Sequence, residues 1–127
     1  MAAKILVAED DKFLANAYRI KLARTGFDAR FAGNGNELFT LLESFSPDVI
    51  VLDLVMPVKD GFETLKELRS SEQWKTIPVI VASNLGQEED YDRAMALGAT
   101  DFVVKSNLKL EELIAKINVL LDKSRPM

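Results

Sequence analysis

The sequence contains no cysteine and no histidine. Without cysteine, the chain cannot form a disulfide or offer a thiolate to a metal ion. The lack of cysteine is compatible with a reducing cytosol, and we expect a cytoplasmic protein. Without histidine, any reaction step that needs an imidazole must take it from another molecule. No apolar run approaches the length of a membrane-spanning helix, so we expect no contact with a membrane.

The composition is that of one folded domain. The chain has 127 residues, of which 48% are hydrophobic and 28% are charged, as is typical of globular domains. Its net charge of −4 argues against a broad electrostatic contact with nucleic acid, and we expect none. The last apolar position of the final helical pattern is Leu121. We therefore expect a domain over residues 1–122 and a tail or linker stub over residues 123–127.

Short runs rich in β-branched residues alternate with longer amphipathic segments along the whole chain. The expected strands are residues 4–8, 27–31, 49–53, 79–82 and 102–104. The first, third and fourth of these are almost continuously apolar, which is typical of strands that are buried on both faces of a parallel sheet.

Between the expected strands, apolar residues recur at helical spacing. Residues 38–45 and 110–121 are the clearest cases, because each places its leucines and other large apolar residues on one face. Gly26 and Gly98 stand where the first and fourth helices are expected to end, as glycine often does. Five alternations of strand and helix predict an α/β sandwich with right-handed crossovers.

Acidic residues come directly after two of the apolar strands. Glu9 and Asp10 follow the first strand, and Asp53 ends the third. If these strands are neighbours, three carboxylates meet at the carboxyl edge of the sheet, where α/β folds place their sites. Two charges about 4 Å apart repel by about 4 kcal/mol at an effective dielectric constant near 20, so the cluster needs a counterion. Asp11 and Asp60 are interpreted as ordinary helix caps or turn residues.

The candidate ligands at this edge are all oxygen atoms. Oxygen ligands favour a hard cation, and Mg²⁺ in particular needs few carboxylates because it keeps several waters. Lys105 ends the fifth strand at the same edge and adds a positive charge, while Ser83 follows the fourth strand and adds a hydroxyl. Carboxylates, a metal ion, an ammonium and a hydroxyl together are suited to holding a phosphoryl group.

Five segments carry a resemblance to a known family. They are Ile5-Leu6-Val7-Ala8-Glu9-Asp10, Pro47-Asp48-Val49-Ile50-Val51-Leu52-Asp53, Met56-Pro57-Val58-Lys59-Asp60-Gly61, Pro78-Val79-Ile80-Val81-Ala82-Ser83 and Phe102-Val103-Val104-Lys105. In this order and spacing, the chain resembles the receiver domains of two-component response regulators, especially chemotaxis regulators. The resemblance implies a flavodoxin-like, doubly wound (βα)5 sandwich whose five-stranded parallel sheet has the strand order 2-1-3-4-5.

The resemblance also implies roles for the residues at the edge of the sheet. Asp53 would accept a phosphoryl group from a phosphohistidine of a histidine kinase or phosphotransfer protein. Glu9, Asp10 and Asp53 would hold Mg²⁺ together with the backbone carbonyl of Val55. The domain would be a signalling switch for a downstream protein partner, catalysing only its own phosphorylation and dephosphorylation, and a monomer or a phosphorylation-dependent dimer.

Three further residues would connect the phosphoryl group to the surface. Lys105 would pair with the phosphoryl oxygens, and Ser83 would form a hydrogen bond to them. As Ser83 moves toward the new oxygens, the loop after it is drawn inward and leaves space into which Phe102 turns. The surface that binds the partner would change as a result.

The chain departs from the family pattern at a few positions. Ser106 stands where the family usually has a proline after the lysine, and a cis bond before a residue other than proline costs about 3–4 kcal/mol. We therefore predict a trans bond between Lys105 and Ser106. Asn84 follows Ser83 where a small residue is common, and it either narrows access to Asp53 or is an ordinary loop amide.

Other functions are compatible with parts of the pattern. A receiver-like interaction module that works without phosphate would be expected to lose the acidic pair, Asp53 or Lys105, and all of these are present. A phosphatase with an aspartyl nucleophile would need a second catalytic carboxylate and a segment that covers its substrate. A flavin-binding module would need hydroxyls and glycines after the first strand, where this chain is acidic.

Overall fold

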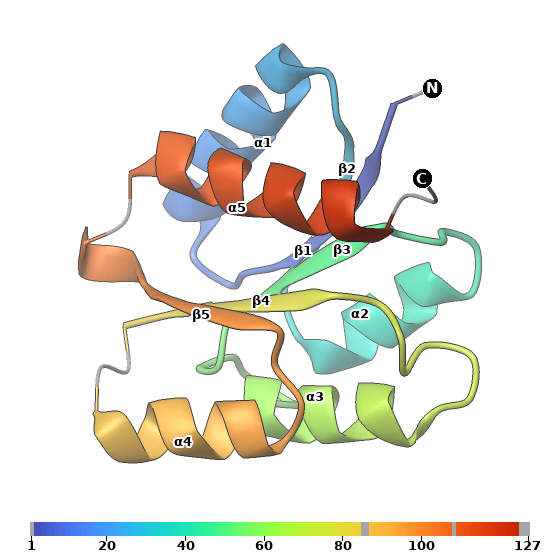
Figure 1. Ribbon diagram of the computed structural model, residues 1–127, viewed down its shortest axis with the longest axis vertical. Coiled ribbons are helices and arrows are strands. Elements are labelled where there is room, and N and C mark those ends of the chain that lie inside the picture. The colour runs from blue at the N-terminus through green and yellow to red at the C-terminus, as the bar shows by residue number, and fades with distance from the viewer. Residues whose placement is uncertain (1, 85–86, 108, 125–127) are drawn as a thin grey trace.

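Strands and helices alternate along the chain in the computed structural model, which describes residues 2–84, 87–107 and 109–124 (Figure 1). The strands are β1 (Lys4–Ala8), β2 (Asp28–Ala32), β3 (Val49–Leu52), β4 (Val79–Ser83) and β5 (Asp101–Val104). The helices are α1 (Lys12–Thr25), α2 (Gly35–Leu42), α3 (Gly61–Ser70), α4 (Glu88–Ala96) and α5 (Leu110–Ser124), with a short 3-10 helix at Lys105–Asn107.

All five strands lie in one parallel sheet with the order β2-β1-β3-β4-β5. Helices α1 and α5 cover one face of the sheet, and α2, α3 and α4 cover the other (Figure 1). The predicted doubly wound fold and its strand order are therefore confirmed. The strand order reverses at β1 and β3, which are neighbours, and this places their carboxyl ends side by side.

The core is divided by the sheet into two layers. Along β1, Ile5 and Val7 face the layer shared with α1 and α5, whereas Leu6 and Ala8 face the layer beneath α2, α3 and α4. Every residue of β3 and β4 is buried, which explains why their sequences show no alternation of apolar and polar residues.

Most of the predicted helix boundaries agree with the structure. Asp11, Asn34 and Asp60 are the N-caps of α1, α2 and α3, and each side chain accepts hydrogen bonds from the first turn of its helix. Gly26 ends α1 in the left-handed conformation, with φ of 92°. The strand limits differ by a residue or so, and β3 ends at Leu52, so Asp53 lies just beyond the strand.

Helix α5 runs across the expected boundary between the domain and the tail. It continues to Ser124, so Lys123 and Ser124 are helical. The helix extends past its last buried residue, Leu121, and Asp122 and Lys123 in its final turn are exposed. The expected tail also includes residues 125–127, which lie outside the described residues. Within the described part of the chain, no helix has the length and apolar character needed to span a membrane.

Candidate functional site

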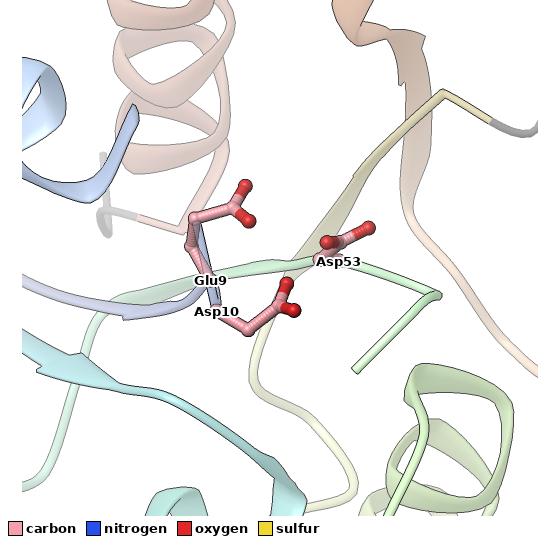
Figure 2. A group of neighbouring side chains, drawn as sticks. All are labelled: Glu9, Asp10 and Asp53. Carbon is pink, nitrogen blue, oxygen red and sulfur yellow. The ribbon is translucent and has the colours of Figure 1, made fainter. Parts of the chain in front are cut away.

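The pairing of β1 with β3 brings three carboxylates together. Ala8 lies opposite Leu52 in the parallel ladder, and the Asp53 N–H donates a 3.1 Å hydrogen bond to the Ala8 carbonyl. Glu9, Asp10 and Asp53 follow these strand ends, and carboxylate oxygens from all three lie within 4.8 Å of one another (Figure 2). The sequence predicted that the three carboxylates would meet if the first and third strands were neighbours. The structure has this arrangement.

The two consecutive acids after β1 have opposite environments. Successive residues of an extended chain point to opposite sides, and in Figure 2 the carboxylates of Glu9 and Asp10 lie on different sides of the backbone. Glu9 is only 5% exposed and so is Asp53, whereas Asp10 is exposed. Burial raises the pKa of Glu9 more than the hydrogen bonds from Lys105 and the Asp11 amide lower it.

Lys105 bridges the two buried carboxylates. Its Nζ lies 2.9 Å from Asp53 Oδ2 and also forms a close ion pair with Glu9 Oε1. Residues Ser83 and Val104 pair in the sheet, so Lys105 leaves β5 at the same edge as the acids. Burial of Lys105 opposes its charged form, but the two carboxylates outweigh burial and raise the pKa of Lys105 above its ordinary value.

An open hollow of about 350 Å³ lies at this edge of the sheet. Its lining residues are Glu9, Asp10, Asp11, Asp53, Val55, Ser83, Asn84 and Lys105. The four carboxylates and one ammonium of this lining leave three negative charges in the hollow when all are ionised. The all-oxygen donor set and this surplus charge fit a divalent hard cation such as Mg²⁺.

Each predicted residue can be placed relative to the hollow. Ser83 is completely buried at its edge, and Val55, whose carbonyl is an expected ligand, donates its N–H to Asp53 Oδ1 over 3.3 Å. Asn84 is exposed at the mouth of the hollow. Phe102 is not among the described residues that line the hollow; its ring packs edge-on against Tyr91 of α4, with 5.5 Å between centroids.

The loop from Asp53 to α3 is shaped by two special residues. The Lys59 N–H donates to the Pro57 carbonyl over 2.7 Å, which closes a γ-turn and holds Val58 at a φ of 68°, a strained value for a β-branched residue. At Gly61, a Cβ atom would lie 2.1 Å from the Asp53 carbonyl oxygen, so only glycine fits there. The loop thus packs closely against the backbone of Asp53.

Two features of the site were not found from the sequence. Asp11 was predicted only as a helix cap or turn residue. In the structure it caps α1 with its side chain, and its N–H also donates to Glu9 Oε2 over 3.1 Å and so orients that carboxylate. Lys105 was expected to contact phosphoryl oxygens, but its contact with Glu9 was not foreseen. The predicted trans bond between Lys105 and Ser106 is confirmed, because no described peptide bond is cis.

Comparison with known proteins identifies the family. A family model described as the response regulator receiver domain matches residues 5–118. The chain belongs to this family. The receiver domain is similar to the "DNA-binding dual master transcriptional regulator RpaA" of Synechocystis, with 34% identity over 93% of this chain and 48% of that protein. It is also similar to the phosphate regulon regulatory protein PhoB of Rhizobium meliloti, with 32% identity over 99% of this chain and 55% of that protein.

Solved structures agree with this assignment. The receiver domain of the Francisella response regulator 1452 superposes with a TM-score of 0.89 at 35% identity, covering 97% of this chain and 99% of that one. The present receiver domain spans about half the length of the curated relatives it matches. Receiver domains are signalling switches, and the acidic cluster of Glu9, Asp10 and Asp53 lies at the carboxyl edge of the sheet in this one.

Proposed function

We propose that this receiver domain is a phosphorylation switch in which Asp53 accepts the phosphoryl group. The observation that carries the proposal is the setting of Asp53. Its carboxylate is almost fully buried, lines an open hollow, and is held by Lys105 beside two further acids. A carboxylate in this setting can be reached from the hollow, and the adjacent Lys105 ammonium can stabilise the transferred charge.

The proposed donor is a phosphohistidine of a histidine kinase or a phosphotransfer protein. Because the chain has no histidine of its own, this group must lie on another protein. A carboxylate oxygen of Asp53 attacks the phosphorus atom. The new P–O bond forms as the P–N bond breaks, and the imidazole leaves with the electron pair and takes up a proton. The resulting acyl phosphate is hydrolysed by water to restore the carboxylate and release phosphate, which ends the signal.

Glu9, Asp10, Asp53 and the Val55 carbonyl would hold Mg²⁺ in the hollow. The bound ion supplies charge neutralisation for the transferring group. Lys105 changes partner during the reaction, because its ammonium, now shared by Glu9 and Asp53, can pair with the incoming phosphoryl oxygens. Asp11 keeps Glu9 in place through its backbone N–H while this exchange occurs.

Ser83 and Phe102 would carry the change to the surface. Ser83 ends β4 at the edge of the hollow, where a hydroxyl can turn toward phosphoryl oxygens. Phe102 packs against α4 through Tyr91, so a rotation of Phe102 alters the surface formed by α4 and β5. A shift of this kind needs a few kcal/mol of differential interaction between the two states.

The test is incubation of the protein with Mg²⁺ and acetyl phosphate, followed by measurement of its intact mass. We expect one added phosphoryl group on the wild type, and none after addition of EDTA or in Asp53→Asn. Asp92→Asn is the matched control, because Asp92 is exposed on α4 and does not line the hollow, and it should be labelled like the wild type.

If no adduct is seen, a second experiment is needed, because the acyl phosphate can hydrolyse before its mass is measured. Beryllofluoride, which mimics the phosphoryl group, should then shift the NMR signals of residues that line the hollow only when Mg²⁺ is present. If a folded protein shows neither the adduct nor this change, the phosphorylation switch is wrong. The alternative, an interaction module that works without phosphate, then takes its place, and Asp53→Asn should leave its partner binding intact.

A further inference from the structure

A tyrosine hydroxyl is buried in the core beneath the site. Tyr18 belongs to α1 and is 2% exposed. Its hydroxyl has no hydrogen-bond partner among the residues that the structure describes. Burying a hydroxyl without a partner costs free energy, so buried tyrosines usually place this group where a partner is available. Tyr18 lies with Leu22 on the apolar face of α1, a position that a phenylalanine would also fill.

The alternation of the strands indicates what lies near this hydroxyl. Tyr18 packs in the same layer of the core as Val7, Val51 and Val103. Glu9, Asp53 and Lys105 each come two residues after one of these valines. Because side chains alternate along a strand, the three lie on the same side of the sheet as the valines, toward its carboxyl edge. The polar end of this layer is therefore the buried half of the candidate site.

Electrostatics agree with this placement. Burial is the largest cause that raises the pKa of Tyr18, and the negative charges of Glu9 and then Asp53 raise it further. The phenol is thus protonated near neutral pH and is available as a hydrogen-bond donor. Glu9 Oε1 is its natural acceptor: this atom is buried, and besides its close ion pair with Lys105 a carboxylate oxygen can accept a second hydrogen bond.

We propose that Tyr18 is a positioning residue for Glu9, with its hydroxyl donating to the Glu9 carboxylate through one buried water. The inference rests on the proposed function, because it assigns Glu9 a role at the metal. A water suits the contact since the two groups form no direct hydrogen bond, and buried waters commonly join polar groups that lack partners. Tyr18 and the Asp11 amide then hold the two oxygens of Glu9 from different sides.

The first test compares Mg²⁺ affinity in Tyr18→Phe and Tyr91→Phe, measured by calorimetry on the whole chain. Both variants lose one tyrosine hydroxyl, but Tyr91 is 46% exposed on α4 and does not line the hollow. Groups that orient a metal ligand matter for affinity, so Tyr18→Phe should raise the Kd for Mg²⁺ by about tenfold. Tyr91→Phe should leave the Kd unchanged. An unchanged Kd in Tyr18→Phe overturns the proposal.

The second test does not require Tyr18 to be replaced. The chain has two tyrosines, so Tyr91→Phe leaves Tyr18 as the sole tyrosine, and isotope-labelled tyrosine then gives one ring signal in NMR. This signal should shift as Mg²⁺ is added, and the shift should disappear when Glu9→Gln is added to the same chain. A shift that persists with Glu9→Gln, or no shift while Mg²⁺ binds, overturns the proposal. If the wild type binds no Mg²⁺, it is the proposed function that has failed.

Discussion

Two partly buried cations in this receiver domain have opposite surroundings. Lys105 lies between the carboxylates of Glu9 and Asp53, and the pair of acids raises its pKa. Arg69 of α3 donates instead to three backbone carbonyls, those of Lys75, Ile77 and Gly98, at 2.8–3.0 Å, and burial lowers its pKa. Both cations have hydrogen-bond acceptors, but only Lys105 is held by charged groups.

The difference separates a binding site from a structural contact. Backbone carbonyls cannot leave Arg69 or take another partner without unfolding the turns that they belong to, so Arg69 holds α3 to the segment before β4 and to the turn before β5. The carboxylates around Lys105 can accept a metal ion, and the ammonium can then move to an anion. Lys105 can therefore exchange its partners, whereas Arg69 cannot.

The largest effect on stability is expected from Lys105→Met. The variant leaves two buried carboxylates without their cation, and removal of one partner of a buried ion pair costs about 3 kcal/mol. Mg²⁺ should restore most of this loss, because it supplies the missing positive charge and binds the folded state. Urea unfolding with and without Mg²⁺ measures both effects. Lys12→Met, at an exposed position, is the control and should change little. If Mg²⁺ did not restore the stability lost in Lys105→Met, the claim that a metal ion can replace the ammonium would be wrong.

Arg69→Met should cost somewhat less, about 2 kcal/mol, because it leaves three carbonyls with fewer donors but no charge unpaired. Here Mg²⁺ should give no more stabilisation than it gives the wild type. Arg24→Met, at an exposed position near the end of α1, is the matched control and should stay within about 0.5 kcal/mol of the wild type. If Mg²⁺ rescued Arg69→Met selectively, the two cations would not differ in the way described.

A smaller effect is expected from pH. Since burial raises the pKa of Glu9, the folded chain holds this proton more tightly than the unfolded chain does. The resulting stabilisation is complete below the ordinary value of 4.5 and is lost as the pH rises through the folded-state pKa. Glu9→Gln removes this titration. The stability of the wild type relative to Glu9→Gln, measured in urea without metal, should therefore fall as the pH increases from 4.5, and a constant difference would be inconsistent with the raised pKa.

The sheet and the position of the acids could be read from the sequence because they follow from short-range patterns. Continuous apolar runs in β1, β3 and β4 indicate strands buried on both faces, and an acid directly after such a strand must lie at its carboxyl edge. The strand order itself came from the family resemblance. Pairing of β1 with β3 then leaves Glu9, Asp10 and Asp53 little freedom to lie apart.

What the sequence did not reveal depends on contacts between distant segments. Nothing local to Lys105 indicates that it reaches Glu9 as well as Asp53, or that Arg69 reaches Gly98. Tyr18 fits an apolar helical stripe, and only the fold brings its hydroxyl into the layer that ends at the acids. The positive φ of Val58 was also hidden, because a valine gives no sign of a γ-turn.

Locating the phosphoryl group within the chain is the most direct test of Asp53 as the acceptor. The protein is labelled with Mg²⁺ and acetyl phosphate, the acyl phosphate is trapped by reduction with borohydride, and the peptides are sequenced by mass spectrometry. We predict that the modification falls on Asp53 alone, with Glu9, Asp10 and Ser83 unmodified. Labelling at one of those three residues, or continued labelling of the chain in Asp53→Asn, would contradict the assignment of Asp53 as the acceptor.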